Sequence, residues 1–586
     1  MSDGTMNTSC AGICQLVRTL GRAVVIIAVS GAAALPLAAQ QAATSASAAP
    51  LVPPSVLQQP LAGDWPTYSG DYTGQRFSRL TQIDRSNVQQ MTLAWVARMN
   101  TSVRGSGTAG GAAPAAGALV TQVGGPGAGD FPVGNASMKG AVLEVDGILY
   151  VTSPDHVWAL DGRDGRERWH YFWKTRGGTH IGNRGAAIWN DSLLFETPDN
   201  YLVSLDVHTG RENWHVEIAD FKQQYFSTMA PVVIGDQVLV GTGNDLDAPG
   251  FLQSFDPRTG KRNWILYTVP MNPGDPGLDT WPSLDAARHG GGQVWMPGSY
   301  DPETNYYIFS TGNPTPGYTG VARRGDNLFT CTLMAVDMAT GKMVWYFQTS
   351  PHDTHDWDSA QTPILFDGTI DGRPRKLVST AARNGFFFTL DRVTGEHIVT
   401  RQFGKTANWF KGVRSSGSPE PDPAKEAQIP GALVSPFEGG VVNWQAPAFN
   451  PLLGLFYVPE SNGFNVLYLT DPDPRGSMGL GGKRAFVTGF ESNALQAIDY
   501  RTGKYAWRHE WPQGASIGSG LLATAGGLLF TGDGSGNFVA MDAANGNLLW
   551  YTRIGNISNA PQTFDIDGRQ FVLVGVGDML YSFVRY

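Results

Sequence analysis

The sequence predicts an all-β protein, an eight-bladed β-propeller whose sheets dock on repeated tryptophans. Three observations support this fold class: a recurring Asp–Gly–Trp pattern, a high glycine content, and the lack of any long helical pattern. Glycine accounts for 73 of the 586 residues and tryptophan for 17. A glycine-rich chain with many aromatic residues is typical of short strands joined by tight turns.

The repeated unit contains an aspartate, a glycine four residues later and a tryptophan four residues after that. We expect the aspartate to bond the turn backbone, the glycine to adopt a positive φ, and the tryptophan to pack between neighbouring sheets. These tryptophans are therefore predicted to be structural. The copies begin at Asp161, Asp206, Asp256, Asp337, Asp391 (with Val399 in place of the tryptophan), Asp499 and Asp542, and a divergent eighth copy ends at Trp95.

Residues 50–586 are predicted to form one propeller domain, since the repeats fill most of that range. The strand-like C-terminal segment 570–586 follows the last repeat, and we expect it to complete the first sheet and close the ring. Two stretches, 101–137 and 404–440, do not fit the repeat. They are rich in Gly, Ala, Ser and Pro, and we expect loops that cap a site or meet a partner.

The N-terminal residues 1–49 have the pattern of a secretory signal peptide and short linker. Arg18 and Arg22 precede an apolar run over 23–37, and small residues follow to Ala49. The alternative, a buried N-terminal helix, fits this order of charges and small residues less well. Cleavage would leave Cys331 as the single cysteine, with no membrane span in the mature chain, and the pattern predicts a periplasmic location.

The charge balance argues against a nucleic-acid or anionic-membrane partner. The chain has 42 Lys and Arg against 51 Asp and Glu, a net charge of −9. Recognition of nucleic acid requires a clustered basic surface, which this composition does not favour.

The residues suited to chemistry lie between the repeats, in a series of short motifs. These motifs are GNRGAAIW, STMAP, GTGND, GGGQVWM, STGNP, PHDTHDWD, ARNG and VNWQAP, in that order. Their order and spacing resemble those of the pyrroloquinoline-quinone (PQQ) alcohol dehydrogenases, the methanol and ethanol dehydrogenase family. The resemblance extends from Gly63 to the C-terminus.

The resemblance implies a cofactor site. Trp295, which lies outside the repeat register, resembles the tryptophan on which the planar quinone stacks. Arg184 resembles the arginine that pairs with a cofactor carboxylate. Further contacts at the cofactor edge are implied for Thr228, Thr242, Asn443 and Trp444.

The resemblance also implies a metal site beside the quinone. Asp245 and Asn313 match metal ligands, and their hard oxygen donors suit Ca²⁺ or a lanthanide. Asp356 matches the catalytic base, and Asp358 the additional acid of the lanthanide-using branch, although a solvated turn acid is the alternative for Asp358. In an extended segment these two carboxylates would point to the same face.

The reaction that the resemblance implies is oxidation of an alcohol to an aldehyde, by metal-assisted hydride transfer to the quinone. Asp356 would take the alcohol proton, and Arg383 would stabilise charge near the reactive quinone oxygens. The printed sequence contains no C-x-x-C-H haem motif, so a separate c-type cytochrome is the expected electron acceptor.

Two departures from the family pattern leave other functions open. Gly178 and Thr179 stand where the family has adjacent cysteines, so we expect His180 to close the cofactor pocket instead. Asp245 stands in place of the family's glutamate and is one methylene shorter. The alternatives are a non-catalytic propeller scaffold of the cell envelope, or a family member that has lost cofactor binding.

Overall fold

The computed structural model describes residues 51–104, 118–127, 133, 137–359, 361–470, 481–512 and 518–586. The predicted signal peptide and linker over 1–49, and much of the Gly- and Ala-rich stretch 101–137, lie outside these residues. Within the described ranges no helix has the length and apolar character needed to cross a membrane.

The described chain consists almost entirely of β-strands. Eight of its sheets have four or five strands, and a ninth is a two-stranded ribbon. In chain order the larger sheets contain β3 (Thr121–Gly124) with β4 (Leu143–Val145), β5 (Ile148–Thr152), β6 (His156–Asp161) and β7 (Glu167–Trp173); β8 (Ala187–Trp189), β9 (Ser192–Glu196), β10 (Tyr201–Asp206) and β11 (Glu212–Glu217); β12 (Val232–Ile234), β13 (Gln237–Thr242), β14 (Phe251–Phe255) and β15 (Arg262–Tyr267); and β16 (Ser299–Asp301), β17 (Tyr306–Ser310), β18 (Thr332–Asp337) and β19 (Lys342–Gln348).

The second half of the chain repeats this arrangement. Its sheets contain β20 (Ile364–Ile370), β21 (Arg373–Ala381), β22 (Phe386–Asp391) and β23 (His397–Gln402); β26 (Ala432–Val434), β27 (Ala448–Asn450), β28 (Leu455–Tyr468), β29 (Lys483–Asp499) and β30 (Tyr505–Glu510); β1 (Phe77–Ser78), β31 (Leu522–Thr524), β32 (Leu528–Gly532), β33 (Asn537–Asp542) and β34 (Leu548–Arg553); and β2 (Met91–Arg98), β35 (Gln562–Ile566), β36 (Arg569–Val576) and β37 (Met579–Arg585). The prediction of an all-β chain built from repeated four-stranded sheets is confirmed. In the ranges that the structure describes, helical structure is limited to α1 (Leu284–Arg288) and the 3₁₀ turns η1 (Val56–Gln58), η2 (Val88–Gln90), η3 (Phe221–Gln223), η4 (Leu278–Thr280) and η5 (Pro423–Lys425).

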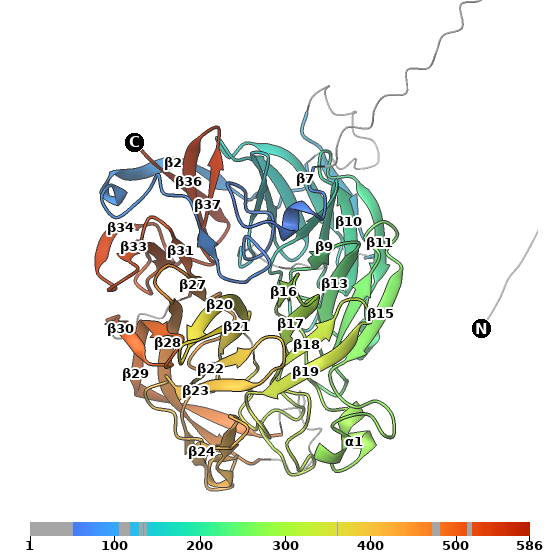
Figure 1. Ribbon diagram of the computed structural model, residues 1–586. Helices are drawn as coiled ribbons and strands as arrows, with labels where there is room; N and C mark the ends of the chain where they lie inside the picture. The colour runs from blue at the N-terminus through green and yellow to red at the C-terminus, as the bar shows by residue number, and fades with distance from the viewer. Residues whose placement is uncertain are drawn as a thin grey trace, which may run out of the picture. The chain divides into compact units, whose positions relative to one another are not determined.

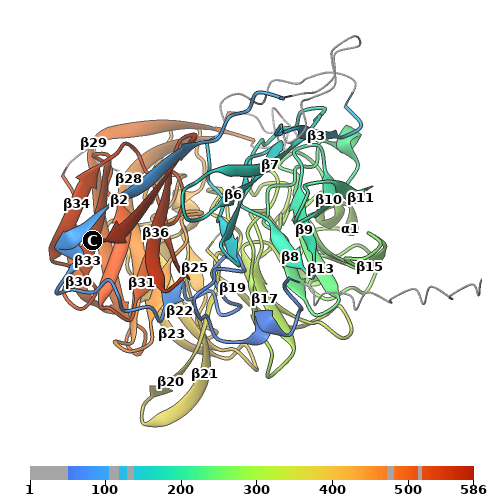
Figure 2. The ribbon, with the colours of Figure 1, turned by 90° about the horizontal axis from the view of Figure 1, so that it is seen from above.

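The sheets follow one another in chain order in the ribbon (Figure 1). Most of their middle strands are buried on both faces, although the first half of β29 is exposed. In the second sheet, β9 and β10 are almost fully buried, whereas the outermost strand β11 alternates between partly buried and exposed residues. Burial on both faces means that each sheet packs against its neighbours, so the core lies between the sheets. The β20–β21 hairpin projects beyond this packing (Figure 2).

The repeat residues join neighbouring sheets as predicted. Gly260 has a φ of +68°, and a Cβ built on it would lie 2.8 Å from the ring of Trp214, the tryptophan of the preceding repeat. Only glycine tolerates both the positive φ and this close approach. The same relation joins Gly165 to Trp95, Gly210 to Trp169, Gly341 to Trp264, Gly395 to Trp345 and Gly546 to Trp507.

The C-terminal strand pairs with an N-terminal strand, as the sequence predicted. β37 runs antiparallel to β2, with Met91 opposite Arg585 and Arg98 opposite Met579. This sheet therefore combines residues from both ends of the described chain, and β2 and β37 lie side by side in Figure 1.

The stretch 404–440 is more regular than the predicted loop. It contains the ribbon of β24 (Phe410–Val413) and β25 (Pro419–Pro421), the turn η5, and the edge strand β26, which pairs with β28. The prolines obscured this strand content, but a two-stranded ribbon consists only of edge strands, where proline is tolerated. Similarly, β3 within the stretch 101–137 pairs in parallel with β7.

Candidate functional site

A cavity of about 390 Å³ lies at the ends of the sheets, within the size range of small-molecule sites. Its walls come mainly from connections between strands, from the β7–β8 connection to the one that precedes β27. The lining residues are Lys139, His180, Ile181, Gly182, Asn183, Arg184, Phe226, Thr228, Asp245, Gln293, Trp295, Asn313, Asp356, Asp358, Arg383, Glu438, Asn443 and Trp444.

The structure brings together every predicted site residue except Thr242 in this one cavity. These residues come from connections that are far apart in the sequence. Thr242 is instead buried at the end of β13, where its hydroxyl has no hydrogen-bond partner. The expected contact of Thr242 with a ligand stays a prediction, since this residue is not part of the lining.

Arg383 is the buried cation at the centre of the acidic residues. Its Nη1 donates to Asp358 Oδ2 at 2.7 Å, its Nη2 donates to the carbonyl of Glu438 at 2.7 Å, and Asp356 Oδ2 lies 4.0 Å from Nη2. The second oxygen of Asp358 accepts the backbone N–H of Asn313 at 2.6 Å. Asp358 is thus held on both oxygens, and the solvated-turn alternative for this residue is wrong.

Burial dominates the electrostatics of the two acids. It raises the pKa of Asp356 well above its usual value, against the attraction of Arg383 and with added repulsion from Asp358 and Asp245. It likewise raises the pKa of Asp358 to about 6, again opposed by Arg383 and reinforced by Asp245. The physical cause is the cost of removing carboxylates from water when cations are too few.

Asp245 is held by two neighbours on the cavity wall. His180 Nε2 lies 2.7 Å from Asp245 Oδ2, and Gln293 Nε2 donates to Asp245 Oδ1. The imidazole of His180 also packs on the ring of Phe226, with centroids 4.7 Å apart. His180 therefore lines the cavity, and its role in closing the cofactor pocket stays a prediction.

Trp295 and Arg184 form the aromatic part of the cavity. The guanidinium of Arg184 lies 4.4 Å from the centroid of the Trp295 ring, a cation–π distance, and donates to Thr228 Oγ1 at 2.5 Å. Trp295 Nε1 donates to Asp358 Oδ2 at 3.2 Å, which links the indole to the acidic cluster.

The acidic segment 356–358 is not an extended strand as expected. Asp356 adopts a φ of +63°, in the left-handed region, yet both carboxylates still line the cavity. Trp357 between them is buried away from it, stacked on His355 at 4.2 Å with its Nε1 bonded to the carbonyl of Phe437. His355 and His352 do not line the cavity, and each contacts a backbone carbonyl.

Several lining residues were not singled out from the sequence. Lys139 and Glu438 lie in segments without a distinctive motif, whereas Ile181 and Phe226 directly precede the GNRGAAIW and STMAP motifs. Gln293 lies two residues before Trp295 in the GGGQVWM motif. An amide so close to the tryptophan expected to stack on the quinone was a sequence signal that could have marked it as a site residue.

The residues present fit both groups that the sequence resemblance implies. Arg184 and Arg383 each keep a buried Nε–H without a partner, which suits an anionic planar ligand over Trp295. The available donors for a cation are carboxylate and amide oxygens, which suit Ca²⁺ or a lanthanide. Among the described residues no three His, Cys, Asp or Glu side chains converge on one point, so a cation here also requires amide oxygens.

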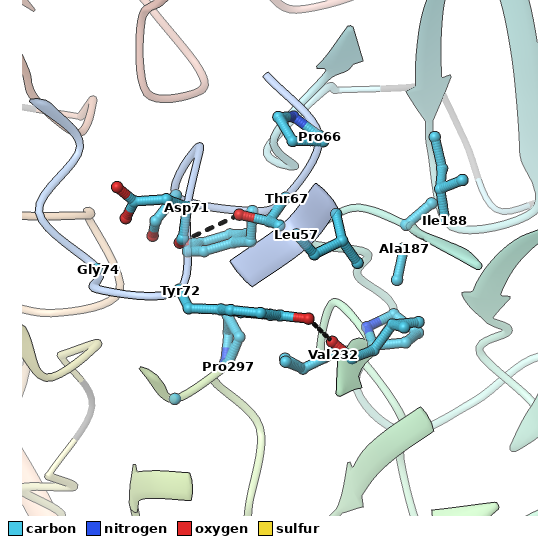
Figure 3. Close-up of a pocket in the computed structure, with 16 residues that line it drawn as sticks. Leu57, Pro66, Thr67, Asp71, Tyr72, Gly74, Ala187, Ile188, Val232 and Pro297 are labelled. Carbon is cyan, nitrogen blue, oxygen red and sulfur yellow. Dashed lines mark hydrogen bonds between the residues drawn. The ribbon is translucent and has the colours of Figure 1, made fainter. Parts of the chain in front are cut away.

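A second cavity, shown in Figure 3, does not qualify as a cofactor site. It lies between the N-terminal segment 57–74 and strands β8 and β12, and Tyr72 extends into it to donate to the carbonyl of Val233 at 2.6 Å. Its volume is about 30 Å³, the space of about one water molecule.

Comparison with known protein families gives two matches. Residues 65–402 match the family described as glucose/ethanol/alcohol dehydrogenase, beta-propeller domain. Residues 481–583 match the family described as outer membrane protein assembly factor BamB.

Individual relatives are similar over most of the chain. Quinohemoprotein alcohol dehydrogenase ADH IIB from Pseudomonas putida is 32% identical over 544 residues, which are 88% of this chain and 73% of the relative. The crystal structure of quinohemoprotein alcohol dehydrogenase from Comamonas testosteroni has a TM-score of 0.79 at 29% identity, covering 91% of this chain and 82% of that chain. A europium-containing methanol dehydrogenase has a TM-score of 0.77 at 27% identity, covering 90% and 99%.

Proposed function

Because the chain belongs to the quinoprotein alcohol dehydrogenases, a family of PQQ-dependent oxidoreductases, we propose that it oxidises a small-molecule alcohol to an aldehyde. The observation that carries this proposal is the convergence of Asp356, Asp358, Arg383 and Trp295 on one cavity. Buried acids with raised pKa values beside a buried cation are typical of catalytic sites.

Asp356 is the proposed base. Its carboxylate lines the cavity and is 4.0 Å from Arg383, the longer of that arginine's two acidic contacts, so it is the acid free to accept the proton of a bound alcohol hydroxyl. Arg383, held by Asp358 and the Glu438 carbonyl, presents fixed positive charge to oxygens that gain negative charge. When bound, the quinone supplies the two-electron acceptor and the metal ion supplies the charge that polarises it.

Cofactor binding is assigned to the aromatic and cationic side of the cavity. Trp295 provides the flat surface, and Arg184 and Thr228, already hydrogen-bonded to each other, provide contacts for a carboxylate. Asn443 and Trp444 line the same cavity and are proposed as further cofactor contacts. Thr242, whose buried hydroxyl at the end of β13 lacks a hydrogen-bond partner within the described chain, remains a predicted cofactor contact.

The proposed metal ligands are Asp245, Asn313, Asp356 and Asp358. All lie on the cavity wall and all offer hard oxygen atoms. Asp358 adds a negative charge suited to a trivalent ion, and one similar structure is a europium-containing methanol dehydrogenase. We therefore favour a lanthanide over Ca²⁺.

The remaining assignments complete the proposal. The eight larger sheets and the β2–β37 pairing support a closed eight-bladed propeller. The basic and apolar N-terminal pattern supports export to the periplasm. The printed sequence lacks a C-x-x-C-H motif, so electrons are proposed to pass to a separate c-type cytochrome, whereas ADH IIB is by name a quinohemoprotein.

The test is reconstitution of the purified chain with PQQ and either Ca²⁺ or La³⁺, followed by an alcohol panel with an artificial electron acceptor. We expect alcohol-dependent dye reduction that Asp356→Asn lowers by at least about a hundredfold, the lower range for loss of a general base. The control is Asp326→Asn, which removes an acid paired with Arg414 at 2.6 Å, outside the cavity.

Two results would contradict the proposal. Failure of PQQ to bind with either metal would favour a member that has lost its cofactor, or a scaffold. Full activity in Asp356→Asn would remove this residue from the chemistry while leaving the family membership intact.

A further inference from the structure

We propose that Gln293 is an additional ligand of the metal ion, through its side-chain oxygen, and that it compensates for the short side chain of Asp245. This inference rests on the proposed metal-dependent function. It concerns a residue that the structure, and not the family resemblance, places in the site.

The side-chain amide of Gln293 uses its nitrogen as a hydrogen-bond donor, whereas its oxygen accepts no hydrogen bond from the described residues. The side chain is 1% exposed, and its Nε2 donates to Asp245 Oδ1. Its Oε1 is buried without any hydrogen-bond partner. An unpaired buried acceptor is costly, so a native site that keeps one usually satisfies it with a water, a ligand or an ion.

The free oxygen faces one of the acidic side chains across Gly312. A Cβ built on Gly312 would clash with Gln293 Oε1 and would lie 2.7 Å from Asp358 Oδ1. The two acceptor oxygens therefore both lie against the backbone of Gly312, where any larger residue would displace them. Two acceptor oxygens held close together suit a hard cation.

The charges near these oxygens favour a cation as their partner. Asp245 and Asp358 are both acids and line the same cavity as Gln293. His180 occupies the second oxygen of Asp245. Since acidic side chains alone do not converge in threes within the described part of the chain, the amide oxygen of Gln293 completes a set that Asp245 cannot complete by itself.

A simpler role for Gln293 is to position Asp245 through Nε2 alone. The two roles differ in their response to a glutamate. A glutamate keeps an oxygen at the ligand position and adds negative charge, but it cannot donate to Asp245. A ligand role therefore predicts that glutamate is tolerated or improves binding, whereas a positioning role predicts that it fails.

The experiment is a terbium titration of the full chain purified without PQQ, followed by Tb³⁺ luminescence on excitation of tryptophan. Trp295 is a suitable sensitiser because its Nε1 lies 3.2 Å from Asp358 Oδ2. We expect Gln293→Leu to weaken Tb³⁺ binding by at least about tenfold, the usual effect of losing a residue that supports a metal site. We expect Gln293→Glu to bind Tb³⁺ as tightly as the unchanged chain or more tightly.

The matched control is Gln496→Leu. Gln496 is equally buried, donates Nε2 to the carboxylate of Glu460 and also has an unpartnered Oε1, but it lies on β29 outside the cavity. Its replacement is expected to leave Tb³⁺ affinity unchanged. Circular dichroism of each variant checks folding, and if the leucine variant misfolds, the glutamate variant still discriminates the two roles.

The outcomes separate this inference from the proposed function. If the unchanged chain does not bind Tb³⁺, the proposed metal-dependent function fails. If the unchanged chain binds Tb³⁺ and Gln293→Leu binds it equally well, the ligand role of Gln293 is overturned. The same holds if Gln293→Glu binds Tb³⁺ as weakly as a folded Gln293→Leu, or about tenfold more weakly than the unchanged chain. In each case the proposed function stands.

Discussion

Arg383 divides its guanidinium unequally between two acids: Nη1 donates to Asp358 at 2.7 Å, while Asp356 lies 4.0 Å from Nη2. Burial alone would lower the pKa of Arg383, but Asp358 and Asp356 together raise it above its ordinary value. The arginine therefore remains a fixed cation. Its close partner, Asp358, has both carboxylate oxygens hydrogen-bonded. Its more distant partner, Asp356, has a carboxylate that faces the cavity more freely.

Replacement of Arg383 is expected to affect both stability and activity. Arg383→Ala leaves buried acids without their cation, which costs about 3–5 kcal/mol of unfolding free energy in comparable pairs. Urea unfolding measures that loss, and the dye-reduction assay measures the loss of turnover. The control is Arg392→Ala, which breaks a buried pair with Asp301 at 2.9 Å, outside the cavity. If Arg383→Ala and Arg392→Ala lost similar stability and kept equal activity, the proposed role of Arg383 would be contradicted.

Removal of Asp358 is expected to change the preferred metal. Asp358→Ala removes one negative charge from the cavity, and this weakens the binding of a trivalent ion more than that of a divalent ion. We expect La³⁺-supported activity to fall at least about tenfold further than Ca²⁺-supported activity, as for other lost metal-site residues. Parallel titrations of the two metals measure this ratio. An unchanged ratio would show that Asp358 serves only to anchor Arg383.

The docking of repeat glycines on tryptophans is testable with a matched pair of glycines. Gly395 and Gly372 have φ values of +75° and +73°, but a Cβ on Gly395 would lie 2.8 Å from the Trp345 ring, whereas nothing lies within 4 Å of one on Gly372. Gly372→Ala is expected to cost about 1–2 kcal/mol for the left-handed conformation alone. Gly395→Ala adds a packing clash worth about 1–3 kcal/mol. Equal losses in urea unfolding would mean that the tryptophan contact contributes nothing.

Glu144 on β4 predicts a pH dependence of stability away from the site. Burial, with repulsion from Asp64 and against a hydrogen bond from the Gly147 N–H, raises the pKa of Glu144 from 4.5 to about 8. The folded state therefore holds this proton more tightly than the unfolded chain. Its stabilising contribution is complete below pH 4.5 and is lost as the pH rises through 8.

The neutral variant Glu144→Gln should lose less stability than the unchanged chain between pH 5 and 9. Each pKa unit corresponds to about 1.4 kcal/mol, so the difference should reach a few kcal/mol. Urea unfolding at several pH values measures it. Identical pH profiles for the two proteins would show that Glu144 titrates normally in the folded state.

The fold was largely predictable from the sequence because its determinants are local and repeated. The turn at Asp206 shows this: its carboxylate accepts the N–H groups of His208 and Thr209, and Gly210 follows with a positive φ. Prediction failed where sequence composition hides strands, as in the proline-containing ribbon of β24 and β25. There, pairing with a neighbour, and not local preference, creates the strand.

The site was predictable only where motifs exist. Asp356, Arg383 and Trp295 lie in recognisable motifs, and the structure brings them together. The contacts of Gln293 and His180 with Asp245 could not be predicted, because they depend on how connections from different sheets approach one another. The left-handed backbone at Asp356 was likewise invisible, since nothing in the residue type requires it.

The pairing of β2 with β37 has a consequence for the order of events during synthesis. The partner of Met91 is Arg585, so the ribosome must produce every residue between these two before this sheet can form. Until then β2 lacks its neighbour, and closing so long a loop carries an entropic cost that only the finished contacts repay. A nascent chain therefore keeps this sheet unformed until β37 emerges from the ribosome, and a chain cut before β37 would leave β2 without its neighbour.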